Sequence, residues 1–330
     1  MKKVIKVLGI LVLFIAVLAG GGLGYLYLSY PKIDAAPDIT VEITPERVSR
    51  GQYLANHVNL CMDCHALREW DKFAGPPKPG TEGTGGEHFN HDMGFPGDIV
   101  SRNITPFGIG DWSDGEVYRA ITSGVSRDGD ALFPVMPYTH YGKMDKEDVY
   151  SLIAYIRSLP PIETEKVETK LDFPLNLIVR TMPQPAEHQP IPDKSDLVAY
   201  GAYMVNAGGC YDCHTHQVKG EFIGEPFAGG MEFNLGNGRM LRSPNITPHM
   251  ENGIGKMSEE DFLNRFRAYR EDFVPAQVGP TDFQTVMPWI MYAGMKDEDL
   301  KAIYAYLQSL DPVDKKVIRF ELIPAATALN

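Results

Sequence analysis

The sequence has few cysteines, and none of them is spare. Only four occur in 330 residues, and all four fall in two short repeats, Cys-Met-Asp-Cys-His at 61–65 and Cys-Tyr-Asp-Cys-His at 210–214. No cysteine therefore remains for a structural disulfide, although exported proteins usually pair theirs. We infer that the four thiols serve another purpose.

The sequence also lacks an excess of positive charge. It has 31 Lys and Arg against 43 Asp and Glu, which gives a net charge of −12, and the basic residues form no stripe. Binding to a phosphate backbone needs a basic surface, so we expect no nucleic-acid partner. The acidity fits simple solubility or docking to a basic redox protein. The length allows two domains, each with its own core.

Charge is missing altogether from Val7 to Pro31, while three lysines precede this run. Crossing a bilayer takes ~20 apolar residues, and a signal-peptide core has only ~7–15. The preceding lysines predict a cytoplasmic N-terminus, so the body of the protein would lie on the periplasmic face of a bacterial inner membrane. We predict a single-pass N-terminal anchor. A cleaved signal peptide is the alternative, favoured by the glycines at 20–22 and the alanines at 35–36.

The two short repeats have the spacing of the attachment signature for c-type haem. Each thiol of a pair adds to one vinyl group of the porphyrin, and the next histidine reaches the iron from below the ring. We therefore predict two covalently bound haem c groups. The residues predicted to attach the haems and bind their irons are Cys61, Cys64, His65, Cys210, Cys213 and His214.

Paired cysteines have two other common uses, a zinc site and a thioredoxin-like redox pair. A four-thiolate zinc site would bring the two pairs together and would not need a histidine after each. A redox pair would open a helix inside a strand–helix–strand unit, which the sequence does not indicate. Both alternatives are therefore weaker than haem attachment.

The second half of the chain repeats the first. Asn-Ile-Thr-Pro occurs at 103–106 and 245–248, and Val-Met-Pro occurs at 135–137 and 286–288, in the same order relative to the signatures. Such order predicts the duplication of a whole domain. The predicted divisions are an anchor, a Pro-rich spacer, a first domain, a linker, a second domain and a tail, at 1–31, 32–45, 46–161, 162–196, 197–312 and 313–330.

Helical signals dominate both halves. We predict a helix over 50–60 that runs into the first signature, one over 113–123 opened by a capping box, and one over 145–159 capped by an aspartate. The Gly- and Pro-rich stretch 73–100 is predicted to be a long loop. Little strand periodicity is visible, so the predicted fold class is all-α. An apolar patch over 171–180 in the linker is expected to pack across a module.

Each iron needs a sixth ligand, and Met136 and Met287 are the predicted ones. Each follows its histidine at a similar distance, stands before a proline and precedes the last helix of its half. A thioether suits reduced iron and raises its reduction potential. The chain has 14 methionines, which commonly fill cores. Met144 and Met295, a distal histidine or an open site therefore remain alternatives.

Two further pairs have uncertain roles in the sequence. Asn103 and Asn245 would either donate to haem propionates or hold a turn, and the sequence does not distinguish the two. His88 and His91 lie in the Gly-rich stretch of the first half, where a solvated loop position is favoured over a metal site.

Taken in order, these motifs resemble the cytochrome c subunits of membrane-bound alcohol and gluconate dehydrogenase complexes, over residues 46–312. The resemblance implies two tandem class I cytochrome c domains that carry electrons from a flavin or quinone-cofactor dehydrogenase subunit toward membrane quinone or an oxidase. It pairs His65 with Met136, and His214 with Met287. Family members usually carry three haem modules, whereas this chain has two.

We thus predict a membrane-anchored dihaem c-type cytochrome of a respiratory chain. It would take electrons from a dehydrogenase or quinol-oxidising partner and pass them to a cytochrome or terminal oxidase, and it would have no catalytic residue of its own. The alternative is a dihaem enzyme of the peroxidase or thiosulfate-dehydrogenase type. Such an enzyme needs one labile haem ligand with an acid–base group beside it. The sequence instead offers a candidate methionine for both irons, and no catalytic carboxylate has diverged between the two repeats.

Overall fold

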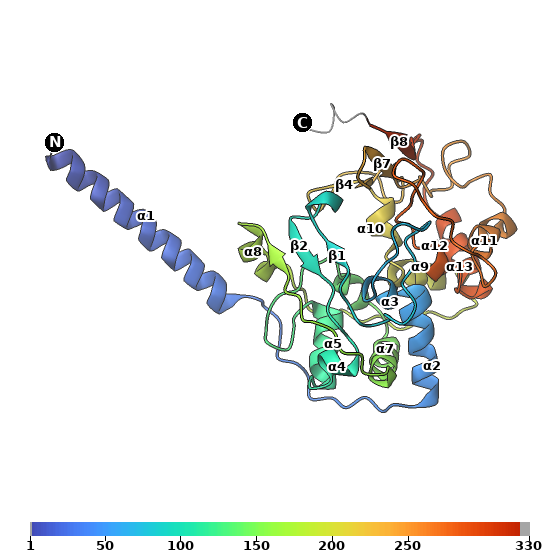
Figure 1. Ribbon diagram of the computed structural model, residues 1–330, viewed down its shortest axis with the longest axis horizontal. Coiled ribbons are helices and arrows are strands. Elements are labelled where there is room, and N and C mark those ends of the chain that lie inside the picture. Colours follow the sequence, from blue (N-terminus) through green and yellow to red (C-terminus); the bar gives the residue numbers. More distant parts are fainter. Residues whose placement is uncertain (1, 324–330) are drawn as a thin grey trace.

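The computed structural model describes residues 2–323. A single long helix, α1 (Lys2–Ser29), projects from a body formed by the rest of the chain (Figure 1). No residue of α1 is buried, and its 18-residue window has a mean hydropathy of 2.6. Among residues 2–323 it is the one helix long and apolar enough to cross a membrane.

The spacer from Pro31 to Thr44 is irregular and forms neither helix nor strand. It nevertheless packs on the body. Val41 is buried, and its backbone N–H donates to Asp114 Oδ2 at 2.8 Å. The spacer is therefore held against the first half and is not a free tether.

The first half of the body consists of short helices around one longer pair. Helix α2 begins where Thr44 caps it and Pro45 fills its first position, five residues before the predicted start at Arg50. It continues into a single turn of π-helix, η1 (Leu54–Val58), before the signature. The helices of this half are α2 (Pro45–Tyr53), α3 (Cys61–Cys64), α4 (Pro106–Ile109), α5 (Asp114–Ser123), α6 (Tyr138–Tyr141) and α7 (Lys146–Ser158).

Two helix starts predicted from the sequence are confirmed. Ser113 and Glu116 form the capping box of α5, and Asp145 caps α7. The second half has the same kind of elements, and Ser258 caps α11 in the same way as Ser113 caps α5. Its helices are α9 (Leu197–Ala207), α10 (Cys210–His214), α11 (Glu259–Arg267), α12 (Trp289–Tyr292) and α13 (Asp297–Gln308).

The longer helices cross in the same manner in each half, α2 on α7 and α9 on α13. A Cβ atom on Gly51 of α2 would lie 1.9 Å from the carbonyl oxygen of Ser151. A Cβ atom on Gly201 of α9 would lie 1.9 Å from the carbonyl oxygen of Ala302. Glycine therefore permits the closest backbone approach at both crossings.

The two halves share one continuous hydrophobic core and exchange hydrogen bonds across it. Tyr203 of the second half donates to Asp148 Oδ2 of the first half at 2.6 Å, and Tyr53 of the first half donates to Asp299 of the second. Both aspartates are buried at the start of the last helix of their half. The contact is thus reciprocal, with an approximate twofold character.

A loop of the first half also docks on the second. Phe73 stacks on Tyr269 with ring centroids 5.7 Å apart, and its backbone N–H donates to the carbonyl of Ala276 at 2.8 Å. Gln284 accepts from the backbone N–H of Ala74 at 2.9 Å. These contacts hold the loop in one conformation.

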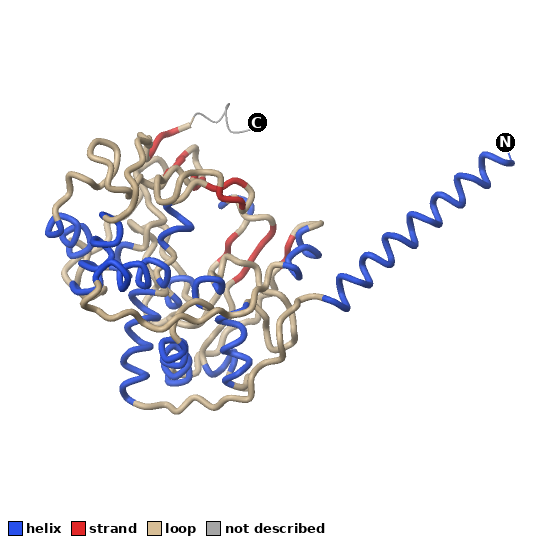
Figure 2. Tube along the Cα trace, turned by 180° about the vertical axis from the view of Figure 1, so that it is seen from behind, coloured by secondary structure: helices blue, strands red, loops and turns tan. Residues whose placement is uncertain are grey.

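The all-α prediction needs correction, because short antiparallel strands accompany the dominant helices (Figure 2). They form three small sheets, ordered β1-β2-β3, β4-β5 and β6-β7-β8. The strands are β1 (His88–Phe89), β2 (Gly97–Val100), β3 (Lys170–Leu171), β4 (Gln217–Val218), β5 (Glu221–Phe222), β6 (Glu232–Asn234), β7 (Arg239–Arg242) and β8 (Phe320–Leu322).

Strand pairing between segments far apart in the sequence explains two differences between the predicted and the observed structure. The stretch 73–100 is not only loop, because it contains the 3₁₀ turn η2 (His91–Met93) and two strands, one of which pairs with β3 in the linker. The tail contains strand β8, which pairs with β7. Such strands are too short to show a pattern of their own. The remaining tail residues, 324–330, lie outside the described part.

Candidate metal centres

The two cysteine pairs each lie on one helical turn that follows a left-handed residue. Leu60 (φ 58°) precedes α3, and Gly209 (φ 62°) precedes α10. Residues three apart in a helix share a face, so both thiols of a pair point the same way. Two thiols that attach to the same porphyrin ring must point in the same direction, and this arrangement provides that.

None of the four cysteines forms a disulfide. Burial raises the pKa of Cys61, Cys64 and Cys210 to about 12, while Cys213 is exposed. Redox-active cysteines need a lowered pKa, which nearby positive charge or a metal supplies. The neutral thiol favoured here does not suit a thioredoxin-like pair.

The zinc alternative also finds no support. Among residues 2–323 no group of three or more His, Cys, Asp or Glu side chains is placed to hold a metal ion. The two cysteine pairs stay in separate halves, on α3 and α10. They do not converge into the four-thiolate cluster that structural zinc takes.

Each signature histidine is held by a backbone carbonyl. His65 Nδ1 lies 2.7 Å from the carbonyl oxygen of Arg102, and His214 Nδ1 lies 2.9 Å from that of Pro244. A carbonyl only accepts, so Nδ1 carries the proton and Nε2 keeps its lone pair. Burial lowers the pKa of both imidazoles. Both histidines are therefore neutral and oriented, as metal-binding imidazoles are.

The structure decides between the two roles considered for Asn103 and Asn245. Asn103 Oδ1 accepts from the backbone N–H of Thr105 at 2.9 Å, and its Nδ2 donates to the carbonyl of Ile162 at 2.8 Å. The side-chain amide is thus used within the protein, where it holds a turn and ties it to the segment after α7.

Asn245 makes the equivalent contacts in the second half. Its Oδ1 accepts from Thr247 at 2.9 Å, and its Nδ2 donates to the carbonyl of Val313 at 2.8 Å. Each asparagine directly follows the residue whose carbonyl holds the signature histidine. The repeated Asn-Ile-Thr-Pro motif therefore fixes the imidazole indirectly, a role that the sequence analysis did not identify.

The two methionine pairs lie in different surroundings. Met144 is fully buried, with Asn59 Nδ2 donating to its sulfur at 3.1 Å, and Met295 is also buried. Met136 and Met287 are only partly buried, directly before α6 and α12. The sulfur of Met144 is already engaged in the core, which favours Met136 over Met144. The choice of sixth ligands remains a prediction.

His88 and His91 do not form a metal site. His88 Nδ1 lies 2.8 Å from Asp98 Oδ1, and His91 Nε2 lies 2.7 Å from Asp172 Oδ2. The hydrogen bond that His91 donates to Asp172, together with the negative charge of Asp172, raises the pKa of His91. Both histidines are exposed and each contacts a single carboxylate, in agreement with the favoured surface role.

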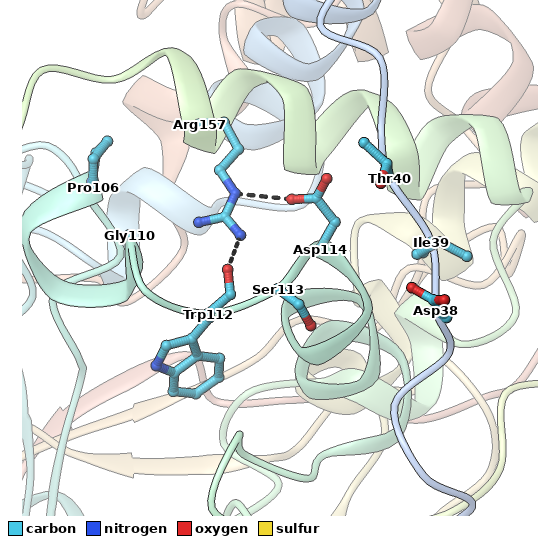
Figure 3. Close-up of a pocket in the computed structure, with 9 residues that line it drawn as sticks. All are labelled: Asp38, Ile39, Thr40, Pro106, Gly110, Trp112, Ser113, Asp114 and Arg157. Atoms are coloured by element: carbon cyan, nitrogen blue, oxygen red, sulfur yellow. Dashed lines mark hydrogen bonds and ion pairs between the residues drawn. The ribbon is translucent and has the colours of Figure 1, made fainter.

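A cleft of 460 Å³ lies where the spacer meets the first half (Figure 3). Its one guanidinium, Arg157, donates to Asp114 Oδ1 at 3.0 Å and to the carbonyl of Ile109 at 2.8 Å, and it also contacts the carbonyl of Trp112. The charged groups of the cleft thus hold the spacer and α5 together. This arrangement gives no support for a substrate site.

The residues present fit haem c. Each half offers paired neutral thiols on one turn, followed by an oriented neutral imidazole. In addition, the buried hydroxyl of Tyr138, two residues after Met136, has no hydrogen-bond partner among residues 2–323. An unpartnered buried donor costs stability unless another polar group meets it. A haem carries such groups on its propionates.

Comparison with known proteins agrees with this chemistry. Residues 198–311 match the cytochrome c family. The chain is 31% identical, over 81% of its length, to "Alcohol dehydrogenase (quinone), cytochrome c subunit" of Gluconacetobacter polyoxogenes, and 30% identical, over 81%, to "Gluconate 2-dehydrogenase cytochrome c subunit" of Pantoea cypripedii. It covers 56% and 60% of these two relatives, so it spans little more than half their length.

A third relative has a length similar to that of the chain. "Diheme cytochrome c-type" of Cereibacter sphaeroides is 28% identical over 90% of this chain and 96% of the relative. The family match covers only the second half, while these alignments cover both.

Proposed function

This chain carries a cytochrome c domain and is related to the cytochrome c subunits of dehydrogenases; from that premise we propose that it is a membrane-anchored dihaem electron carrier. The proposed divisions are cytochrome c domains over 46–161 and 197–312, joined by the linker 162–196. Helix α1 would anchor both domains at the periplasmic face of the inner membrane.

The observation that carries this proposal is the repeated histidine geometry. In each half a neutral imidazole directly follows the cysteine pair, and the carbonyl of the residue before a hydrogen-bonded asparagine orients it. Bound haem would supply iron that changes its charge by one electron. The cysteines would hold the ring, His65 and His214 would bind on one side, and Met136 and Met287 would close the other.

The protein's own contribution to electron transfer is a rigid setting. The asparagine clamps fix both imidazoles, and the shared core fixes one half against the other. A rigid setting would keep the geometry around each iron nearly unchanged when the iron is oxidised, and this is what an electron carrier requires. A dehydrogenase subunit is the proposed donor, by analogy with the named relatives, and a cytochrome or terminal oxidase is the proposed acceptor.

The first test counts haems and their attachment. Protein matured in a host that attaches haem c should contain two haems per chain. Replacing the cysteines of one signature by alanine, Cys61→Ala with Cys64→Ala, should leave one haem, and Cys210→Ala with Cys213→Ala should leave the other. A colourless wild-type protein would contradict the proposal.

The second test concerns the sixth ligands. Methionine-bound ferric haem has a weak near-red absorption band, and Met136→Ala and Met287→Ala should each remove about half of it, since each half supplies one ligand. The matched controls Met144→Leu and Met295→Leu conserve core volume and should leave the band unchanged. A high-spin wild-type spectrum with peroxide turnover would instead support a dihaem enzyme.

A further inference from the structure

An apolar patch stands on the linker, next to the end of α1. It consists of Leu171, the last residue of β3, and the short helix α8 (Leu175–Ile178), with the turn between them. Phe173 is 79% exposed and Ile178 is 45% exposed. Asp172 is the only charged residue from Leu171 to Val179. We call residues 171–178 the linker patch.

The fold holds this patch in place, so the exposure of its side chains is enforced. Leu171 pairs with Gly97 of β2, and the backbone N–H of Asp172 donates to the carbonyl of Pro96 at 3.1 Å. Asn176 donates from its backbone to the carbonyl of Asp172 at 2.9 Å. A segment tied at these points cannot turn its apolar side chains inward without losing the pairing.

One arginine, Arg180, joins the linker patch to the C-terminal end of α1. The Arg180 guanidinium lies 4.8 Å from the ring centroid of Tyr27 and donates to the carbonyl of Tyr30 at 2.8 Å. Buried Val179 connects this arginine to α8. Both views place α8 beside the end of α1, at the edge of the body from which α1 leaves (Figures 1 and 2).

The C-terminal end of α1 is rich in the residues that proteins place at a membrane–water interface. Tyr25, Tyr27 and Tyr30 gather there, and tyrosine is enriched at headgroup level. Lys32 lies 5.0 Å from the Tyr30 ring centroid. With Arg180 it places two cations at this point of a chain whose net charge is −12. Cations beside apolar side chains suit an anionic lipid surface.

We propose that the linker patch inserts into the surface of the same bilayer that α1 crosses. Phe173 and Ile178 would enter the boundary between headgroups and acyl chains, while Arg180 stays with the phosphates. The protein would then be held at two points. Because the patch pairs with β2 of the first half, the first half would face the bilayer in a fixed orientation. The inference rests on the proposed anchor role of α1.

The test uses the full-length, haem-loaded protein in vesicles of phosphatidylethanolamine and phosphatidylglycerol. A photoreactive side chain is introduced by Phe173→p-benzoylphenylalanine. The matched control is Phe107→p-benzoylphenylalanine, since Phe107 is 49% exposed on α4, a helix that is drawn apart from α8 (Figure 1). Illumination should yield several-fold more lipid adduct at position 173 than at position 107, measured by mass spectrometry.

The outcomes separate the two proposals. Release of the chain by alkaline washing would overturn the anchor, and the linker patch inference with it. Retention of the chain with equal adducts at both positions would overturn the linker patch inference alone. Cross-linking of position 173 to a protein in native membranes, with no lipid adduct, would also overturn it by assigning the patch to a partner subunit.

A second variant tests the consequence for orientation. Phe173→Asp with Ile178→Asp should leave the chain in the bilayer through α1 but free the body to tilt. Polarised absorption of the haems in oriented bilayers should then lose part of its dichroism, while haem content stays at the wild-type value. Unchanged dichroism would contradict a second point of attachment.

Discussion

The two halves hold the same signature aspartate in different ways. Asp63 forms an ion pair with Arg68 of its own half at 3.1 Å, and both side chains are only 6% exposed. Asp212 contacts His140 of the other half at 2.9 Å, with side chains 36% and 15% exposed. Asp63 thus forms a buried ion pair within its own half, whereas Asp212 forms a partly exposed pair across the contact between the halves.

The difference follows from two substitutions between equivalent positions, since Arg68 corresponds to Gln217 and His140 to Met291. His140 of α6 corresponds in the repeat to Met291 of α12, which has no charge to offer Asp63. The first half instead supplies Arg68, which also lies 4.1 Å from the ring centroid of Trp70. Arginine stays protonated at any physiological pH, whereas histidine does not. A duplicated site has therefore acquired a fixed charge in one half and a switchable charge in the other.

Removing the buried cation should have the largest effect. Arg68→Leu leaves the Asp63 carboxylate without its partner in a buried position, which typically costs about 3–5 kcal/mol of unfolding free energy. Urea unfolding of the haem-loaded protein measures this loss. Adding Asp63→Asn should restore much of the stability, because it removes the orphaned charge.

An exposed ion pair provides the control for this prediction. The side chains of Lys256 and Glu251 are 60% and 70% exposed, so Lys256→Met should change stability by less than about 1 kcal/mol. If Arg68→Leu lowered the free energy of unfolding no more than Asp212→Asn does, the distinction between the buried Asp63 pair and the partly exposed Asp212 pair would be wrong.

The sequence could predict the parts of each half that depend on local patterns. The signatures, the caps at Ser113 and Asp145 and the order of the repeat all follow from neighbouring residues. The contacts between the halves do not, because nothing near Asp212 in the chain shows that His140 reaches it. The same holds for Asn103, whose partners lie in the linker. The strands of the linker and tail were missed because their pairing is long-range and only two or three residues long.

A second comparison concerns the reciprocal tyrosine contacts. Asp148 accepts from Tyr203 and also from Arg50, through two bonds of 2.8 Å. Asp299 accepts from Tyr53 and from Tyr200, the latter at 2.8 Å, and has no ion pair among residues 2–323. The carboxylate of the second half therefore depends more heavily on hydroxyl donors.

Two matched variants test this comparison. Tyr53→Phe should cost about 2–3 kcal/mol of unfolding free energy, because it removes one of two hydroxyl donors from a buried carboxylate. Tyr203→Phe should cost only about 1 kcal/mol, because Arg50 still compensates Asp148. Urea midpoints of the two variants measure the difference. Equal losses would show that the arginine adds nothing to the first contact.

The smallest expected effect is the pH dependence of the pairing across the halves. Burial alone would lower the pKa of His140, but the hydrogen bond and charge of Asp212, with the Asn206 hydrogen bond, outweigh burial and the opposing Lys143, so the pKa is raised. A raised folded-state pKa means that the stabilisation is complete below the unfolded value of 6.5 and is lost as pH rises through the folded value.

The variant His140→Met makes the two halves alike at this position. It should lose up to about 1 kcal/mol of unfolding free energy near pH 5.5, because the pair is partly solvated, and much less near pH 8.5. Comparing variant with wild type at each pH cancels the titration of other groups. In the Asp63 pairing Arg68 keeps its proton over this range. Any pH dependence there would come from Asp63, because burial raises the pKa of this carboxyl against the opposing charge of Arg68. A loss of equal size at both pH values would mean that His140 contributes by packing, and the contrast between a fixed and a switchable charge would then fail.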